Sequence, residues 1–247
     1  MEQRRIRLAV RYDGTDFAGS QVQPGRRTVA GTLKAGLESL LGQSVHLLFA
    51  GRTDAGVHAE ENVCTFDAAL PLPVDRLAQV LNRRLPPDLR VRSAAEVPQS
   101  FHPRYSARTR VYAYRVYRSM DVPVDRLRFT MPYEGPWNEV AVQHALSGLA
   151  GRHSFSSFAV GSLLPRYSLC TMDPVEFGER GPEIFWRFRA NRFLRQMVRR
   201  LAGALLEVAA GRVGPQQFAE ALSGPAGFQF KPALSQGLTL LKIEYDS

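Results

Sequence analysis

Apolar side chains alternate with polar or small ones at the start of the chain, where Ile6, Leu8, Val10 and Tyr12 are the apolar positions. A period of two is typical of a strand with one buried face. Leucines then recur at helical spacing, and strand-like and helix-like patterns alternate further along. The first half is predicted to contain, in order, a helix over about 28–41, strands near 45–50 and 61–67, a second helix capped by Asp75, and a strand over 89–97.

The second half repeats this type of pattern. It is predicted to contain a strand over 108–118, a helix near 138–150, a strand over 184–190, a long helix over about 193–210, and a closing strand over 238–245. Two β-α-β-β-α-like halves predict a pseudo-repeat of ferredoxin-like (RRM-like) units. No Pro- or Ser-rich linker separates them near residue 105. We therefore expect an α+β fold, in which lobes 1–105 and 106–247 share a mostly antiparallel sheet with helices on one face.

Composition narrows the class of protein. The chain has 247 residues, 45% of them apolar, which suits a folded globular protein. The net charge is +9, and all but three of the 32 Lys and Arg residues are arginine. This balance fits a polyanionic partner. No apolar run is long enough for a membrane span and no signal peptide is apparent, while Cys64 and Cys170 lie far apart, so we expect a cytoplasmic protein. The histidines lack ligand spacing, so no metal is expected.

The candidate chemistry lies in residues 49–59, FAGRTDAGVHA. This segment contains one carboxylate, Asp54, one cation, Arg52, and one imidazole, His58. Strand-like sequence flanks it on both sides, which predicts a loop held between two strands, a common place for catalytic residues. A lone aspartate in such a loop more often serves as a turn or cap residue, so the loop alone does not decide between the two interpretations.

Eight ordered segments resemble signatures of the bacterial tRNA pseudouridine synthase A family. They are YDGTDFAG at 12–19, AGRTDAGVH at 50–58, LNRRLPPD at 81–88, FHPRYSA at 101–107, YAY at 112–114, GRHSFSSF at 151–158, NRFLRQMVR at 191–199 and PALSQGL at 232–238. The resemblance implies two lobes that meet at a central cleft, a homodimer, and no cofactor. It also implies an isomerase that acts on uridines at positions 38 to 40 of the tRNA anticodon stem-loop.

The resemblance assigns three catalytic positions. The family's essential aspartate falls on Asp54, its base-stacking tyrosine on Tyr112 and its arginine on Arg199, whereas Tyr114 is assigned to the core. Asp54 would either attack C1′ of the ribose or abstract a ribose proton to give a glycal, and the sequence leaves both paths open. Because a carboxylate in a dry cleft takes up a proton unless a cation is near, Arg199 is the expected partner of Asp54. The target uridine must be flipped out of the stem-loop.

Other cations are candidates for binding RNA. Arg192, Arg195 and Arg199 are predicted to share one face of the long helix, where a solvated basic face is the alternative interpretation. We expect Arg192 and Arg195 to meet phosphates. Arg52 would hold phosphate or take the place of the flipped base. His58 would contact RNA or act as a hydrogen-bonded structural residue.

Two other functions compete with this prediction. A non-catalytic protein that binds structured RNA would need cations and aromatics but no carboxylate in a cleft, so Asp54 argues against it. A nucleoside or glycoside hydrolase would normally need two carboxylates across the bond, and only one is placed by motif. Departures from the family pattern leave the details of RNA contact open; they are Ser20, Ala30, Lys34 and Ser154.

Overall fold

The computed structural model describes residues 3–161, 165–223 and 229–246. The chain forms two compact units. The first contains the chain up to Arg108 together with the segment from Leu240 onward, and the second is Thr109–Thr239. The predicted lobes divide at 105/106, close to the first junction, but they place the final segment in the second lobe.

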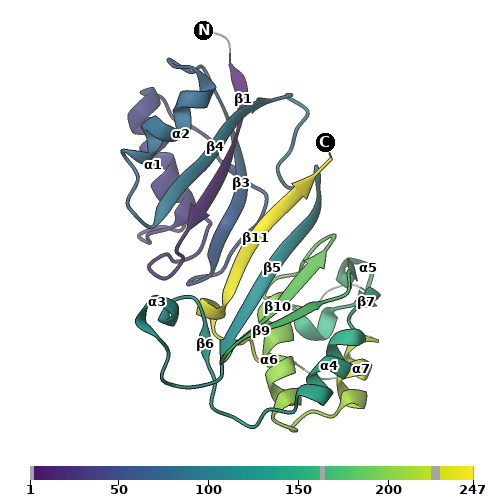
Figure 1. The fold of residues 1–247 in the computed structure, drawn as a ribbon. Coiled ribbons are helices and arrows are strands. Elements are labelled where there is room, and N and C mark those ends of the chain that lie inside the picture. The colour runs from purple at the N-terminus through teal and green to yellow at the C-terminus, as the bar shows by residue number, and fades with distance from the viewer. Residues whose placement is uncertain (1–2, 162–164, 224–228, 247) are drawn as a thin grey trace. The chain divides into compact units, whose positions relative to one another are not determined.

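The first unit is built on an antiparallel sheet with β1 (Arg4–Tyr12) between β3 (His58–Ala68) and β4 (Leu89–Val97) (Figure 1). The short strand β2 (Leu48–Phe49) pairs with β3, and β11 (Leu238–Tyr245), which belongs to this unit from Leu240 onward, follows β3 in the strand order. The four apolar positions of the pattern are buried in β1, as predicted, and Ala9 is buried as well. Two helices, α1 (Val29–Leu41) and α2 (Val74–Asn82), lie on the same side of β1 and β4 in Figure 1.

The ends of these helices follow from local chemistry. The Thr28 side chain accepts the Gly31 backbone N–H and caps the start of α1, and Gly42 ends that helix with a φ of 66°. The cap predicted for α2 is wrong, because the helix begins two residues earlier than a cap at Asp75 implies, directly after Pro73. Asp75 lies instead in the first turn, where its charge still complements the helix dipole.

The second unit is also mostly antiparallel. It contains β5 (Ala107–Tyr117, from Thr109 onward), β6 (Met131–Pro132), β7 (Gly151–Ser154), β8 (Leu169–Met172), β9 (Glu176–Arg180) and β10 (Glu183–Ala190). In register, β10 runs antiparallel to β5, β8 and β9, whereas β6 runs parallel to β5. The helices are α3 (Val124–Leu127), α4 (Glu139–Ser147), α5 (Pro165–Ser168), α6 (Met197–Ala209) and α7 (Pro215–Leu222), with 3₁₀ turns at Ser156–Phe158 and Ser235–Gly237. The α+β class and the mostly antiparallel pairing are confirmed.

The long helix starts later than the sequence predicted. α6 begins at Met197, because Gln196 has a left-handed φ of 61° that an α-helix cannot pass through. Arg192 and Arg195 therefore precede the helix, and the prediction that they share a helical face with Arg199 is wrong. None of the helices in the described part of the chain is both long and apolar enough to cross a bilayer.

Candidate active site

Asp54 lies on a short loop between β2 and β3, in the turn formed by residues 54–57. The Val57 backbone N–H donates to the Asp54 carbonyl at 3.2 Å, and Gly56 has a φ of +77°. This places glycine at the third position of the turn, where a left-handed residue is required in a type II turn. The Asp54 residue is partly buried.

The opening turn, residues 13–20, follows β1 and is hydrogen-bonded to this loop. The backbone N–H of Ser20 donates to the Thr53 carbonyl at 3.0 Å, and the Ser20 hydroxyl accepts the Thr53 N–H at 2.8 Å. Contact is so close that a Cβ on Gly14 would lie 2.0 Å from the Val57 carbonyl oxygen. The segments 12–19 and 50–58, which both resemble family signatures, are therefore packed directly against each other.

A buried polar network holds the residues just before Asp54. The Tyr12 hydroxyl lies 2.9 Å from Thr53 Oγ1 and accepts from Asn62 Nδ2 at 3.1 Å. The Asn62 side chain also donates to the Gly51 carbonyl at 2.9 Å and accepts the Gly51 N–H at 3.3 Å. Burial raises the pKa of Tyr12 to about 12, although its hydrogen bonds to Thr53 and Asn62 oppose the shift. Tyr12 is therefore a neutral phenol, and either its hydroxyl or that of Thr53 donates in the bond between them.

His58 is only 2% exposed and its ring points to the opening turn. Its Nδ1 lies 3.0 Å from the Gly14 backbone nitrogen and 3.1 Å from Asp13 Oδ1. One nitrogen cannot accept from Gly14 and donate to Asp13 at the same time, but either bond ties His58 to that turn. This geometry favours the structural alternative for His58, and contact with RNA stays a prediction.

In the second unit, Tyr112 lies on β5 opposite Phe188 of β10 and is 7% exposed. The ring of Phe193 meets it edge to face, with centroids 5.0 Å apart. Phe193 is partly exposed and lies between β10 and α6, in the segment that the sequence assigned to the helix. A base that stacked on Tyr112 would have to pack beside the Phe193 ring or displace it. The sequence did not predict this contact between Phe193 and Tyr112.

Arg199 lies in the first turn of α6 and is partly buried. Its Nε donates to the Ala233 carbonyl at 2.9 Å, while the Ala233 N–H donates to the Arg199 carbonyl at 2.9 Å. The segments 191–199 and 232–238 are thus joined through this arginine. Tyr114 is nearby in the core, as predicted, with its hydroxyl donating to the Leu234 carbonyl at 2.8 Å. Burial raises the pKa of Tyr114 and the Arg199 charge opposes the rise.

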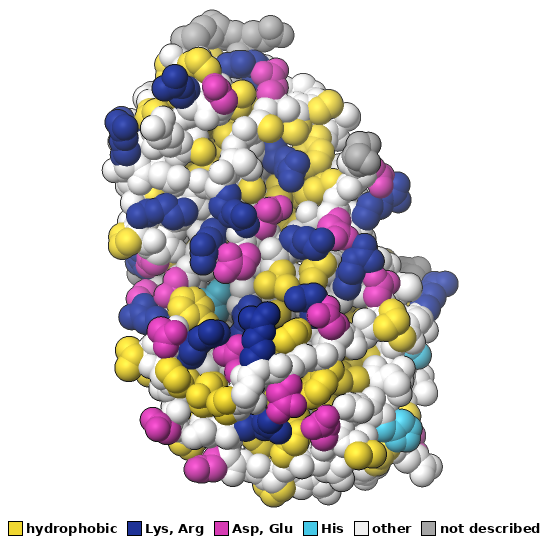
Figure 2. Space-filling model, viewed as in Figure 1, with side chains coloured by type: hydrophobic (Ala, Val, Ile, Leu, Met, Phe, Trp, Pro, Cys, Tyr) yellow, Lys and Arg dark blue, Asp and Glu magenta, His cyan; other side chains and the backbone are white. Residues whose placement is uncertain are grey.

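The remaining predicted cations are exposed. Among the described residues, no carboxylate lies within ion-pair distance of Arg52, Arg192 or Arg195. Many other arginines pair with acids, such as Arg5 with Asp67 at 2.8 Å. Figure 2 shows the same mixture, with Asp and Glu side chains among the Lys and Arg side chains of the visible face. The net positive charge is thus carried by a subset of the arginines.

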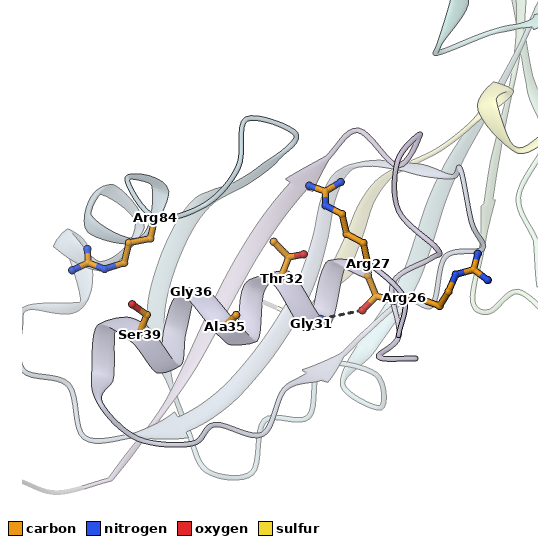
Figure 3. Close-up of a pocket in the computed structure, with 9 residues that line it drawn as sticks. Arg26, Arg27, Gly31, Thr32, Ala35, Gly36, Ser39 and Arg84 are labelled. Atoms are coloured by element: carbon orange, nitrogen blue, oxygen red, sulfur yellow. Dashed lines mark hydrogen bonds between the residues drawn. The ribbon is translucent and has the colours of Figure 1, made fainter. Parts of the chain in front are cut away.

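A hollow of about 480 Å³ lies along α1 (Figure 3). It is lined by three arginines, Arg26, Arg27 and Arg84, and by small residues of the helix. Arg27 forms a bidentate ion pair with Asp88, in which Nη1 and Nη2 each lie 2.8 Å from a carboxylate oxygen. The lining contains no carboxylate, so the hollow lacks the group that the proposed chemistry needs. In the part of the chain that the structure describes, no cluster of three or more His, Cys, Asp or Glu could hold a metal ion.

Comparison with known proteins decides the family. Residues 8–106 and 145–246 match the family described as tRNA pseudouridine synthase. The chain belongs to this family. Asp54 and Arg199 lie within the matched ranges, whereas Tyr112 lies between them. Members of the family are isomerases, so the non-catalytic and hydrolase alternatives are set aside.

Individual relatives agree with this assignment. The chain is 42% identical to tRNA pseudouridine synthase A of Halalkalibacterium halodurans, over 89% of this chain and 84% of that protein. It is 38% identical to the enzyme of that name from Chlorobium phaeovibrioides, over 97% of this chain and 99% of that protein. A crystal structure of a Cbf5-Nop10-Gar1 complex matches with a TM-score of 0.37 and 11% identity, over 95% of this chain and 57% of that chain, a likeness too low to inform the fold.

Proposed function

We propose that this tRNA pseudouridine synthase acts on uridines at positions 38 to 40 of the anticodon stem-loop. Support comes from the eight signature segments and from relatives named tRNA pseudouridine synthase A that match over nearly the whole chain. Neighbouring positions have different base sequences around them, so recognition would rest on RNA shape and phosphate contacts.

The single observation that carries the proposal is the placement of Asp54. It is the carboxylate of a glycine-containing turn that the opening turn and a buried polar network hold in place. The N1–C1′ bond of the uridine breaks, the base turns, and C5 bonds to C1′. The proton on C5 leaves and N1 gains one, so the reaction is redox-neutral and needs no cofactor. Asp54 acts on the ribose, by attack at C1′ or by abstraction of a ribose proton.

Tyr112 and Arg199 complete the proposed catalytic set. Tyr112 would stack on the flipped base and assist removal of the C5 proton, after the Phe193 ring gives way. Arg199 would keep Asp54 ionised in a site from which water is excluded. Its bond to the Ala233 carbonyl fixes the guanidinium and supports this role.

Binding of tRNA would depend on cations without acidic partners, chiefly Arg52, Arg192 and Arg195. A homodimer, a cytoplasmic location, and two ferredoxin-like halves sharing one sheet around a central cleft are further parts of this proposal.

The decisive test is pseudouridine mapping of tRNA from a strain that lacks this protein. We expect the modification to disappear at positions 38 to 40 and to return when the wild-type gene, but not the Asp54→Asn gene, is restored. Unchanged modification at those positions would contradict the proposed substrate, and loss at other tRNA positions would replace it.

A further inference from the structure

The segment 101–106 forms a turn that presents one aromatic ring to solvent. Tyr105, at 77% exposure, is among the most exposed large apolar side chains in the described part of the chain. Isolated exposed apolar residues need no special explanation. Tyr105 differs because His102 contacts its ring and also accepts its backbone N–H.

His102 holds the turn in shape. Its Nδ1 accepts the backbone N–H of Arg104 at 3.1 Å and that of Tyr105 at 3.2 Å. The His102 backbone N–H donates in turn to Ser106 Oγ at 3.1 Å. The imidazole also packs against the Tyr105 ring, with centroids 4.3 Å apart and the two planes tilted by 35°. The backbone and the ring of Tyr105 are thus both held by His102.

The base of the turn is anchored to the sheet of the first unit. The Tyr245 hydroxyl of β11 donates to the Pro103 carbonyl at 2.8 Å, and its ring contacts Phe101 at 5.0 Å. Arg5 of β1 donates to the Phe101 carbonyl at 3.3 Å. An exposed ring on so well anchored a turn loses little conformational entropy when it binds a partner.

The charge beside Tyr105 indicates the kind of partner. The Arg104 guanidinium lies 5.9 Å from the centre of the Tyr105 ring, and Arg104 is itself exposed. A flat ring beside a guanidinium suits an unpaired nucleobase with its phosphate, because bases stack on aromatic rings and arginines meet phosphates. An apolar protein surface would gain nothing from the cation.

We propose that Tyr105 is a stacking platform for an unpaired base of the tRNA, with Arg104 contacting the adjoining phosphate. This inference rests on tRNA as the substrate. The platform contributes to binding and positioning of the tRNA rather than to the chemical step, which is assigned to Asp54.

The test compares tRNA binding by Tyr105→Ala and Tyr105→Phe, with Tyr167→Ala as a control at another exposed tyrosine. Tyr105→Ala is expected to weaken binding of an unmodified tRNA transcript roughly 5- to 150-fold, because stacking of one base on an aromatic ring is lost. Tyr105→Phe keeps the ring and should bind as wild type does. Tyr167→Ala should leave both tRNA binding and turnover unchanged.

A second measurement locates the base. 2-Aminopurine is placed in turn at unpaired positions of the transcript, where stacking quenches its fluorescence. We expect quenching at one position with wild type and Tyr105→Phe, and none there with Tyr105→Ala. The variant His102→Ala should weaken binding as well, and His102→Asn should restore part of it, because an asparagine oxygen can accept the same backbone N–H groups.

Three results would overturn the platform. They are unchanged binding by Tyr105→Ala, equal loss in Tyr105→Ala and Tyr105→Phe, and loss of self-association in Tyr105→Ala, which would assign the ring to a protein contact. Pseudouridine formation by the wild-type protein on the same transcript distinguishes failure of the platform from failure of the proposed function. If the wild-type protein forms no pseudouridine at positions 38 to 40 yet Tyr105→Ala still weakens tRNA binding, the site of modification is wrong and the platform stands.

Discussion

The Asp54 loop and the arginine segment before α6 differ in how their side chains are held. In the Asp54 loop, Gly51 and Thr53 are fixed by buried partners on two strands and on the opening turn. Arg192 and Arg195, by contrast, are exposed and have no acidic partner among the described residues. Both segments resemble family signatures, yet one is rigidly supported and the other projects into solvent.

This difference matches the two tasks that the enzyme must perform. Chemistry on one ribose needs a carboxylate placed within a fraction of an ångström, which requires a supporting network. Attraction of a polyanion needs charge near the surface, and long side chains that adjust to phosphates serve it well. We therefore expect changes near Asp54 to alter turnover and changes in the exposed arginines to alter affinity.

The largest expected effect is that of Asp54→Asn. The amide keeps the size of the side chain but is neither a nucleophile nor a base. We expect single-turnover pseudouridine formation to fall by at least about 10⁴-fold, with tRNA binding retained. The matched control is Asp75→Asn, an exposed aspartate in the first turn of α2, which should leave turnover unchanged. Near-normal turnover by Asp54→Asn would disprove the mechanism, and lost binding would make Asp54 a structural residue.

Deuterium at C2′ of the target uridine separates the two paths that we propose for Asp54. Abstraction of the C2′ proton in a rate-limiting step would slow single turnover severalfold, whereas direct attack at C1′ does not break that bond. The measurement is the ratio of single-turnover rates for tRNA transcripts with protium and deuterium at C2′.

The next effect is that of Arg199→Ala, for which Arg200→Ala is a close control. Both arginines lie on α6 and both donate to a carbonyl of the segment 230–233, Arg200 through Nη1 to Phe230 at 2.9 Å. If Arg199 acts on the reacting groups, Arg199→Ala should lower turnover about 10²-fold. Arg200→Ala should lower it much less. Equal losses in turnover and in the free energy of unfolding would reduce Arg199 to an anchor for that segment.

The sequence predicts elements elsewhere in the chain better than it predicts either of these two regions. The strands over 89–97 and 238–245 and the first helix agree closely with prediction, because their periodicity and caps are local signals. The start of α6 was missed because a left-handed Gln196 has no marker in the sequence. The supporting network was missed too, since Tyr12, Thr53 and Asn62 meet only after β1 and β3 pair.

Ser20, a departure from the family pattern, tests that network. Ser20→Ala removes the acceptor of the buried Thr53 N–H, which costs about 1–3 kcal/mol in the free energy of unfolding. We expect turnover to fall roughly tenfold because the loop that holds Asp54 loosens, with affinity for tRNA unchanged. Ser223→Ala, at an exposed serine, is the control. A stability loss without any change in turnover would show that Ser20 supports the fold and not the position of Asp54.

The smallest expected effect concerns the salt dependence of tRNA binding. Each phosphate neutralised by an arginine releases counterions, so replacing Arg52, Arg192 or Arg195 by Ala should reduce the slope of log K against log salt by about 0.7–0.9. Arg11 is the matched control, because it is exposed but already lies 3.1 Å from Glu60. Arg11→Ala should alter the slope much less, since Glu60 offsets its charge before RNA arrives. Binding is measured at four or more salt concentrations for each variant, on the same transcript. If Arg11→Ala changed the slope as much as the other three variants do, an acidic neighbour would not determine which arginines bind RNA. The contrast between the two regions would then rest on the Asp54 loop alone.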